Sequence, residues 1–98
     1  MSARNTRAKG VAFEREVADA LEAAGFTVRG LEAGGDHLAV KGDRIVHVEA
    51  KRHERMQLPE WLRQQERDWP DGERVLIYRQ SRRPMYVVQR FDQWATRQ

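Results

Sequence analysis

Apolar residues recur every three or four positions along the first regular segment of the chain. Phe13, Val17 and Leu21 follow this spacing, with charged residues between them. Residues at that spacing share one face of a helix, and glycine readily ends a helix. The pattern therefore predicts an amphipathic helix over residues 11–24 that ends at Gly25.

The remainder of the chain shows short apolar runs and one longer helical segment. Lys41-Gly42-Asp43 is a turn signal between two of these runs, so those runs should pair as an antiparallel hairpin. Strands are predicted over residues 26–29, 38–40, 45–51, 75–78 and 85–88, and helices over residues 59–69 and 91–94. Residues 75–78 are apolar on successive positions, which predicts a strand buried on both faces. This order predicts an α/β domain with a mixed central sheet flanked by helices.

Length and composition limit the class of protein. A chain of 98 residues fits one domain. Residues 1–9 are polar and basic, which predicts a flexible arm before a single domain over residues 10–98. Cysteine is absent, which excludes disulfide scaffolds, thiolate zinc sites and cysteine nucleophiles. No run is apolar enough for a membrane span or a signal peptide, so we expect an intracellular, cytoplasmic protein with no membrane partner.

The net charge is +3, and the basic residues occur in clusters. The clusters are Arg4, Arg7 and Lys9; Lys51, Arg52 and Arg55; and Arg79, Arg82 and Arg83. The planar guanidinium group matches phosphate oxygens, so the clusters favour a polyanionic partner such as DNA. The alternative is an ordinary solvated basic surface.

Two acidic residues and a lysine form the strongest chemical pattern. Glu49 and Lys51 are two positions apart in a predicted strand and therefore point the same way, while Asp36 follows two glycines before the preceding strand. If these strands pair, both acids can bind one hard cation, with an amine beside them, as metal-assisted phosphodiester hydrolysis requires. The alternatives are a Glu–Lys ion pair at a strand end and an aspartate that serves a turn.

Other residues have both a functional and a structural interpretation. Glu14 lies at the edge of the apolar helical stripe and would approach the sheet, or it is a solvated helix glutamate. His47 shares a face with Glu49 and could approach the site, although a satisfied, partly buried histidine is the favoured interpretation. Asp43 is better explained by the hairpin turn. The aromatic residues are favoured as core rather than as platforms for bases; they are Trp61, Trp69, Trp94 and Tyr86.

An ordered set of motifs resembles the PD-(D/E)xK nuclease superfamily, and most closely its small Holliday junction resolvases of archaeal and phage type. The set is Lys9-Gly10, Phe13-Glu14-Arg15-Glu16-Val17, Gly25-Phe26-Thr27-Val28-Arg29, Gly35-Asp36 and Glu49-Ala50-Lys51. Gly35 stands where the superfamily name has proline, and residues 31–35 lack the serine of archaeal resolvases. The resemblance implies a restriction-endonuclease-like core and a phage-encoded protein as one source.

The resemblance also implies roles for individual residues. Glu14 matches the acid of the first helix, Asp36 and Glu49 match the metal-binding acids, and Lys51 matches the lysine that positions or activates water. Arg15 and Arg29 fall near basic positions that contact phosphate.

Together, the residues and the resemblance predict a Mg²⁺-dependent DNA endonuclease, with Mn²⁺ as an alternative metal. We expect a homodimer that resolves four-way junctions, with apolar residues such as Trp61, Leu62 or Trp94 available for its interface. Two alternatives stay open. One is a nicking or repair nuclease of the same superfamily, and the other is a basic DNA-binding module without catalysis.

Overall fold

The elements follow the predicted order along the chain. The computed structural model describes residues 3–31 and 36–98, and side chains from residue 10 onward within those ranges. Its elements are α1 (Ala3–Ala23), β1 (Thr27–Gly30), β2 (Asp36–Lys41), β3 (Arg44–Arg52), α2 (Leu58–Asp68), β4 (Glu73–Arg79), β5 (Tyr86–Val88) and α3 (Phe91–Thr96). The order confirms the predicted α/β class.

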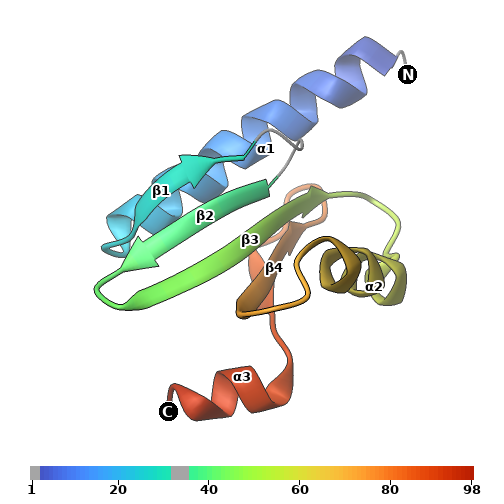
Figure 1. The fold of residues 1–98 in the computed structure, drawn as a ribbon. Coiled ribbons are helices and arrows are strands. Elements are labelled where there is room, and N and C mark those ends of the chain that lie inside the picture. The colour runs from blue at the N-terminus through green and yellow to red at the C-terminus, as the bar shows by residue number, and fades with distance from the viewer. Residues whose placement is uncertain (1–2, 32–35) are drawn as a thin grey trace.

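One mixed sheet organises the domain (Figure 1), with the strands in the order β1-β2-β3-β4-β5. Neighbouring strands are antiparallel except β3 and β4, which are parallel. Parallel strands need a crossover connection, and α2 supplies it between β3 and β4. The hairpin of β2 and β3 turns at Gly42, whose φ of 60° suits a tight two-residue turn.

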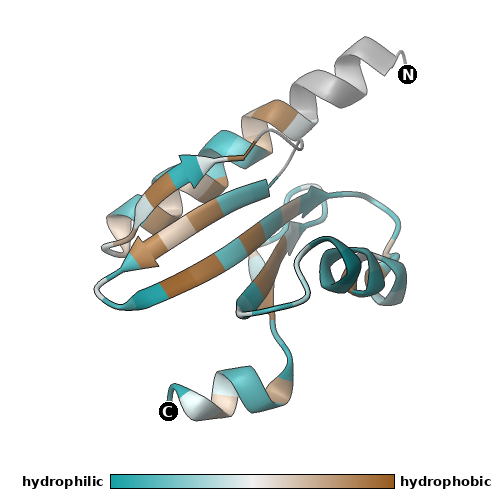
Figure 2. Cartoon of the chain, in the orientation of Figure 1, coloured by the Kyte–Doolittle hydropathy of each residue, from teal (hydrophilic) through white to brown (hydrophobic). Residues whose placement is uncertain are grey.

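The apolar stripe of α1 packs on one face of the sheet. Phe13 and Val17 are buried against the even positions of β3, Val46 and Val48 among them. Figure 2 shows these apolar positions as brown bands along the strands beside α1. The odd positions of β3 therefore face the other side, because strand side chains alternate.

The second helix covers that other face. Trp61 and Gln65 of α2 are buried, and Leu76 of β4 is buried between the helix and the strand neighbours. The predicted burial of β4 on both faces is confirmed for its central residues Val75 and Ile77 on the α1 side and Leu76 on the α2 side.

The first helix begins earlier than the apolar pattern predicts. The structure continues α1 back to Ala3, so residues 3–9 are helical. Alanine, arginine and lysine favour helices even without an apolar stripe, which explains why periodicity missed this extension. The side chains of Arg4, Arg7 and Lys9 lie outside the described residues.

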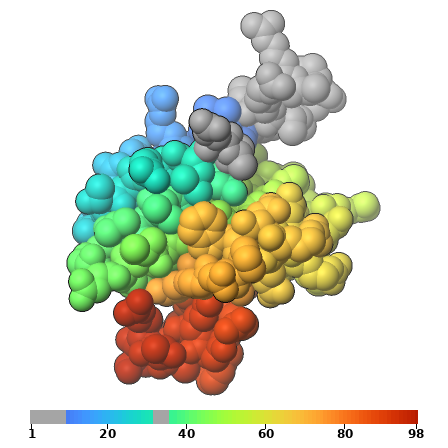
Figure 3. Space-filling view, in the orientation of Figure 1, coloured from blue at the N-terminus to red at the C-terminus, as the bar shows by residue number. Residues whose placement is uncertain are grey.

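The C-terminal helix is anchored where β4 begins and projects from the body of the molecule (Figure 3). Glu73 of β4 accepts two hydrogen bonds from Arg44, at 2.7 and 3.0 Å, and pairs with Arg97 at 3.2 Å. These bonds hold the pKa of Glu73 at about 2, the Arg44 hydrogen bond being the main cause.

The aromatic prediction is half right. Trp61 is buried as predicted, and Trp69 is half-buried, but Trp94 and Tyr86 are exposed because the short α3 and the edge strand β5 leave them uncovered. Among the helices in the described part of the chain, none has the length and apolar character to cross a membrane.

Candidate active site

Two predicted acids meet across adjacent strands. In the antiparallel pairing of β2 and β3, Asp36 lies opposite Glu49. Directly opposed residues project from the same face, with side chains about 5 Å apart at their Cβ atoms. The Asp36 side chain is only 11 % exposed, and that of Glu49 is 6 % exposed. The sheet register therefore brings together two carboxylates that are far apart in sequence, on the face covered by α2.

The environment of Glu49 disfavours its charge. Burial raises the pKa of the Glu49 carboxyl, and the neighbouring Asp36 charge raises this pKa further. The ammonium of Lys51 opposes both effects by lowering the same pKa. A buried carboxylate beside a second carboxylate is destabilised unless a positive charge compensates it. Such a pair offers hard oxygen ligands to a cation.

Lys51 supplies the positive charge next to the acids. Its Nζ atom lies 3.2 Å from Oε1 of Glu49, and its side chain is 22 % exposed. The ammonium therefore contacts both the buried carboxylate and the solvent, where a phosphate would approach. This confirms that Glu49 and Lys51 share a face, as strand alternation predicts.

His47 completes the row on β3. Its ring is 1 % exposed, and Nε2 lies 3.4 Å from Oδ2 of Asp36. Gln65 of α2 contacts Nδ1 at 3.0 Å, and the Trp69 ring stacks on the imidazole with centroids 4.9 Å apart. Both ring nitrogens have polar neighbours in the core, and the ring also lies beside Asp36. The structural and the functional interpretation of His47 are therefore both compatible with the fold.

Glu14 is not part of an assembled ligand set. It is half-buried on α1, which packs on the opposite face of the sheet from Glu49. Across residues 10–31 and 36–98, no group of three or more His, Asp or Glu side chains has an arrangement suited to a metal ion. A two-carboxylate site is what the described residues provide.

Basic side chains surround the same end of the sheet. Arg52 ends β3 and is paired in register with Arg79, which ends the parallel strand β4. The turn after β4 presents Arg82 and Arg83, both exposed, and Arg55 is exposed in the segment after β3. Because parallel strands end at the same edge, these arginines lie toward the edge where Lys51 is found.

The other predicted phosphate contacts have different surroundings. Arg15 on α1 and Arg29 on β1 are exposed, so both can reach an external ligand. Arg79 is engaged instead, because its Nη1 atom donates to Glu16 at 2.6 Å and its guanidinium lies over the Phe13 ring. Arg79 therefore ties α1 to β4.

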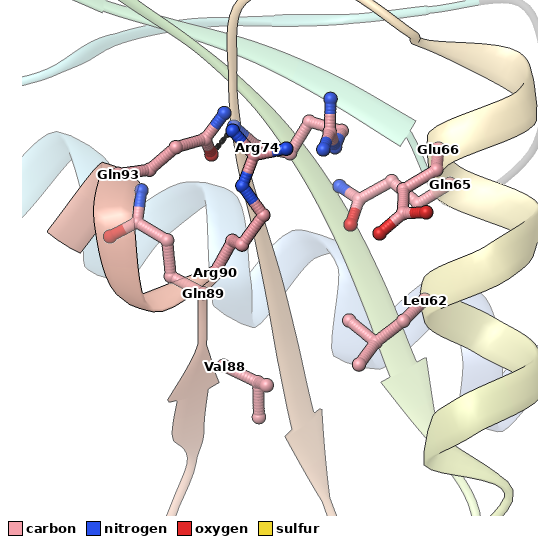
Figure 4. A pocket seen from close by; sticks show the side chains of 8 residues that line it. All are labelled: Leu62, Gln65, Glu66, Arg74, Val88, Gln89, Arg90 and Gln93. Atoms are coloured by element: carbon pink, nitrogen blue, oxygen red, sulfur yellow. Dashed lines mark hydrogen bonds between the residues drawn. The ribbon is translucent and has the colours of Figure 1, made fainter.

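A separate pocket of about 100 Å³ lies between α2, β4 and α3 (Figure 4). Arg74 in its wall is buried, and its Nη1 atom donates to the carbonyl oxygens of Trp69 and Pro70. The backbone N–H of Arg74 donates to the side chain of Gln93 on α3. These contacts join β4 to α3 and to the segment after α2, so the pocket belongs to the packing of the C-terminal helix.

Gln65 is a site neighbour that the sequence interpretation missed. Trp61 and Gln65 of α2 are spaced four residues apart and share a face, and Trp69 directly follows the helix four residues after Gln65. A glutamine between two aromatic residues on a buried face signals a polar partner inside the core. That spacing was the clue in the sequence.

The residues present fit a divalent cation. Carboxylate oxygens are the ligands that Mg²⁺ and Mn²⁺ prefer, and Asp36 and Glu49 present them side by side. Burial is the first cause of the raised pKa of Glu49, and a cation beside this carboxylate would favour its charged form. The site chemistry and the metal are therefore compatible.

A mixed sheet between α1 and α2, with opposed acids and a lysine at one end, defines a nuclease of the PD-(D/E)xK superfamily. The chain belongs to the archaeal Holliday junction resolvase (hjc) family, and the sequence model of that family matches residues 5–93. Membership assigns it to the nucleases that act on branched DNA and depend on a divalent metal.

A solved structure supports the same fold. The chain is similar to a 1.6 Å structure of Hjc, a Holliday junction resolvase from the archaeal hyperthermophile Archaeoglobus fulgidus. The TM-score is 0.61 at 21% sequence identity, and the match covers 83% of this chain and 72% of that one. A comparison with curated protein sequences found no match.

Proposed function

We propose that the site of Asp36, Glu49 and Lys51 hydrolyses phosphodiester bonds in four-way DNA junctions with Mg²⁺, or Mn²⁺ in its place. The single observation that supports this most directly is the register that sets Asp36 opposite Glu49. Two largely buried carboxylates side by side raise the cost of each other's charge, which a shared cation would offset.

In this proposal Asp36 and Glu49 hold the cation, which supplies Lewis acidity that activates water and offsets charge on the phosphate. Lys51 then has a defined task. Its ammonium reaches solvent beside Glu49, so it can donate hydrogen bonds to a phosphate oxygen or orient the attacking water. Its positive charge also stabilises the extra negative charge of the transition state.

Glu14 would act at longer range in the same reaction. It is half-buried on α1, next to the buried Phe13 of the packed stripe. We propose that it holds a water or an additional ligand of the cation when DNA is bound.

The DNA contacts are proposed on the basic side chains near the site. Four arginines lie at or just after the ends of β3 and β4, near Lys51; they are Arg52, Arg55, Arg82 and Arg83. Arg15 and Arg29 extend this surface over α1 and β1, and Arg4, Arg7 and Lys9 would add contacts from the first turns of α1. Contacts of this kind position the backbone without reading sequence.

A homodimer would present two such sites to one junction. Resolution requires two incisions at symmetric positions, and a two-fold axis relates two sites in the way that it relates the arms. Trp61 is buried within the subunit and cannot serve the interface, which corrects one expectation from the sequence. Leu62 is half-buried, whereas Trp94 and Phe91 are exposed and can serve it.

Cleavage of matched DNA substrates tests the proposal. We expect the protein with Mg²⁺ to cut a synthetic four-way junction at paired positions near its branch point, and to cut a linear duplex of the same arm sequence far more slowly. Light scattering should show a dimer at micromolar concentration. Equal cleavage of duplex and junction, or a monomer on the junction, would contradict junction resolution by a dimer.

A further inference from the structure

The His47 ring is held by three neighbours from two elements. The Gln65 amide contacts Nδ1 at 3.0 Å, the Trp69 ring stacks within 15° of parallel, and Oδ2 of Asp36 lies 3.4 Å from Nε2. If the imidazole ring of His47 served only to fill the core, the stacking contact with Trp69 would be sufficient. Here both ring nitrogens face polar partners.

The contact with Gln65 decides which nitrogen carries the proton. Nε2 of Gln65 also donates to the carbonyl oxygen of Val75 at 2.9 Å and approaches that of His47 at 3.4 Å. A flipped amide would place its oxygen against these two carbonyl oxygens, which repel it, so the nitrogen is the atom that faces His47. The amide nitrogen can only donate, and therefore Nδ1 of His47 accepts.

With Nδ1 as acceptor, the neutral imidazole carries its proton on Nε2. That nitrogen lies 3.4 Å from Oδ2 of Asp36. The 3.4 Å separation is longer than a tight hydrogen bond, so the two groups are in polar contact.

We propose that His47, with its tautomer set by Gln65 and its plane set by Trp69, is a positioning residue that orients Asp36 for the cation. The inference rests on the proposed role of Asp36 as a metal ligand. It adds a series of side-chain contacts that runs from Gln65 of α2 through His47 of β3 to Asp36. Partners of this kind commonly change metal affinity by about 10–100-fold.

The tautomer can be read directly without metal. Long-range ¹H–¹⁵N correlation spectra of the histidine side chains in the metal-free protein should show His47 with a protonated Nε2 and an unprotonated Nδ1. Gln65→Met removes the donor to Nδ1, so His47 should then show the other tautomer or a mixture. A protonated Nδ1 in the wild-type protein would overturn the inference.

Two amide variants separate positioning from packing. In His47→Gln the side-chain nitrogen lies the same number of bonds from Cα as Nε2, so it can still donate to Asp36. In His47→Asn the amide ends near the place of Nδ1 and cannot reach Asp36. Titration with Mn²⁺ should therefore show affinity within a few-fold of wild type for His47→Gln and about 10–100-fold weaker for His47→Asn. Equal affinities of the two folded variants would overturn the positioning role.

Asp36→Asn distinguishes this inference from the proposed function. If Asp36→Asn weakens Mn²⁺ binding while His47→Asn does not, the acid is a ligand and the role of His47 is refuted. If Asp36→Asn leaves Mn²⁺ binding unchanged, the proposed metal site itself fails. Thermal unfolding of each variant verifies that the compared proteins are folded.

Discussion

Asp36 and Glu49 are register partners in the antiparallel pair of β2 and β3, and this pairing places both carboxylates on the face of the sheet that α2 covers. A shift of the register by one residue would turn one of the two acids to the opposite face. The hairpin turn at Gly42 fixes that register, although the turn lies at the far end of both strands. The proposed active site therefore depends on backbone geometry remote from it.

Substitution of each central site residue should abolish cleavage while leaving DNA binding intact. We expect Asp36→Asn, Glu49→Gln and Lys51→Ala each to lower the rate of junction cleavage by about a hundredfold or more, a loss of at least about 2.7 kcal/mol of transition-state stabilisation. Asp43→Asn, in the exposed turn of the same hairpin, is the matched control and should cut normally. Gel-shift binding in EDTA should survive in all four variants. Wild-type rates in the three site variants would refute the assignment.

Glu49→Gln should have opposite effects on stability without and with metal. Because burial raises the folded pKa of Glu49, its charged form destabilises the metal-free fold as the pH rises above the ordinary glutamate pKa of 4.5. The neutral glutamine avoids this cost, so the variant should unfold at a higher temperature than wild type in EDTA at pH 7.

With a divalent metal the order should reverse. A cation at a hundredfold excess over its dissociation constant stabilises the wild type by about 2.7 kcal/mol, and Glu49→Gln should lose most of that gain. Thermal melts in EDTA, Mg²⁺ and Mn²⁺ measure both effects, with Glu22→Gln on the exposed side of α1 as the control. If the melting temperature of the wild type is the same in EDTA and in each divalent metal, a preformed metal site is contradicted.

The ion pairs of Glu73 should make the stability of the fold depend on pH below about pH 5. Its folded pKa is lowered to about 2 from the ordinary value of 4.5, chiefly by the Arg44 hydrogen bond. The stabilisation is therefore fully present above about pH 5 and diminishes as the pH falls from there to about 2. Glu73→Gln should be less stable than wild type at pH 7, and the difference should vanish near pH 2. Denaturant unfolding across this pH range measures it, and a difference that does not depend on pH would show that the ion pairs are not its source.

The exposed arginines after β4 should contribute to affinity by binding phosphates. Replacement of Arg82 and Arg83 by glutamine should reduce the slope of log affinity against log salt by about 0.9 for each phosphate that the variant no longer neutralises. Arg90→Gln removes an exposed arginine that pairs with Asp92 next to α3, and it should leave the slope unchanged. Salt titrations of junction binding in EDTA provide the measurement. A decrease in slope for Arg90→Gln as large as that for the Arg82 and Arg83 replacement would indicate a general charge effect.

Local patterns in the sequence predicted the elements and part of the site. The stripe of Phe13 and Val17 predicted the face of α1 that packs on the sheet, because helical period depends only on neighbouring residues. Strand alternation likewise predicted that Glu49 and Lys51 share a face, and the turn at Gly42 predicted the hairpin. The ordered motifs indicated the nuclease family before any tertiary contact was known.

The tertiary structure decided what local patterns cannot contain. Three features depend on how segments distant in sequence pack. They are the pairing of Asp36 with Glu49, the burial of His47 against Gln65, and the exposure of Trp94. Burial in particular is a property of the neighbours that a side chain meets, so Trp61 and Trp94 look alike in the sequence and differ in the fold. The sequence by itself determined which residues can perform the chemistry and on which face of each element they lie. The pairing of β2 with β3 decided that Asp36 lies beside Glu49, because the side chains of a strand alternate between the two faces of a sheet. The packing of α1 placed Glu14 on an element that covers the opposite face.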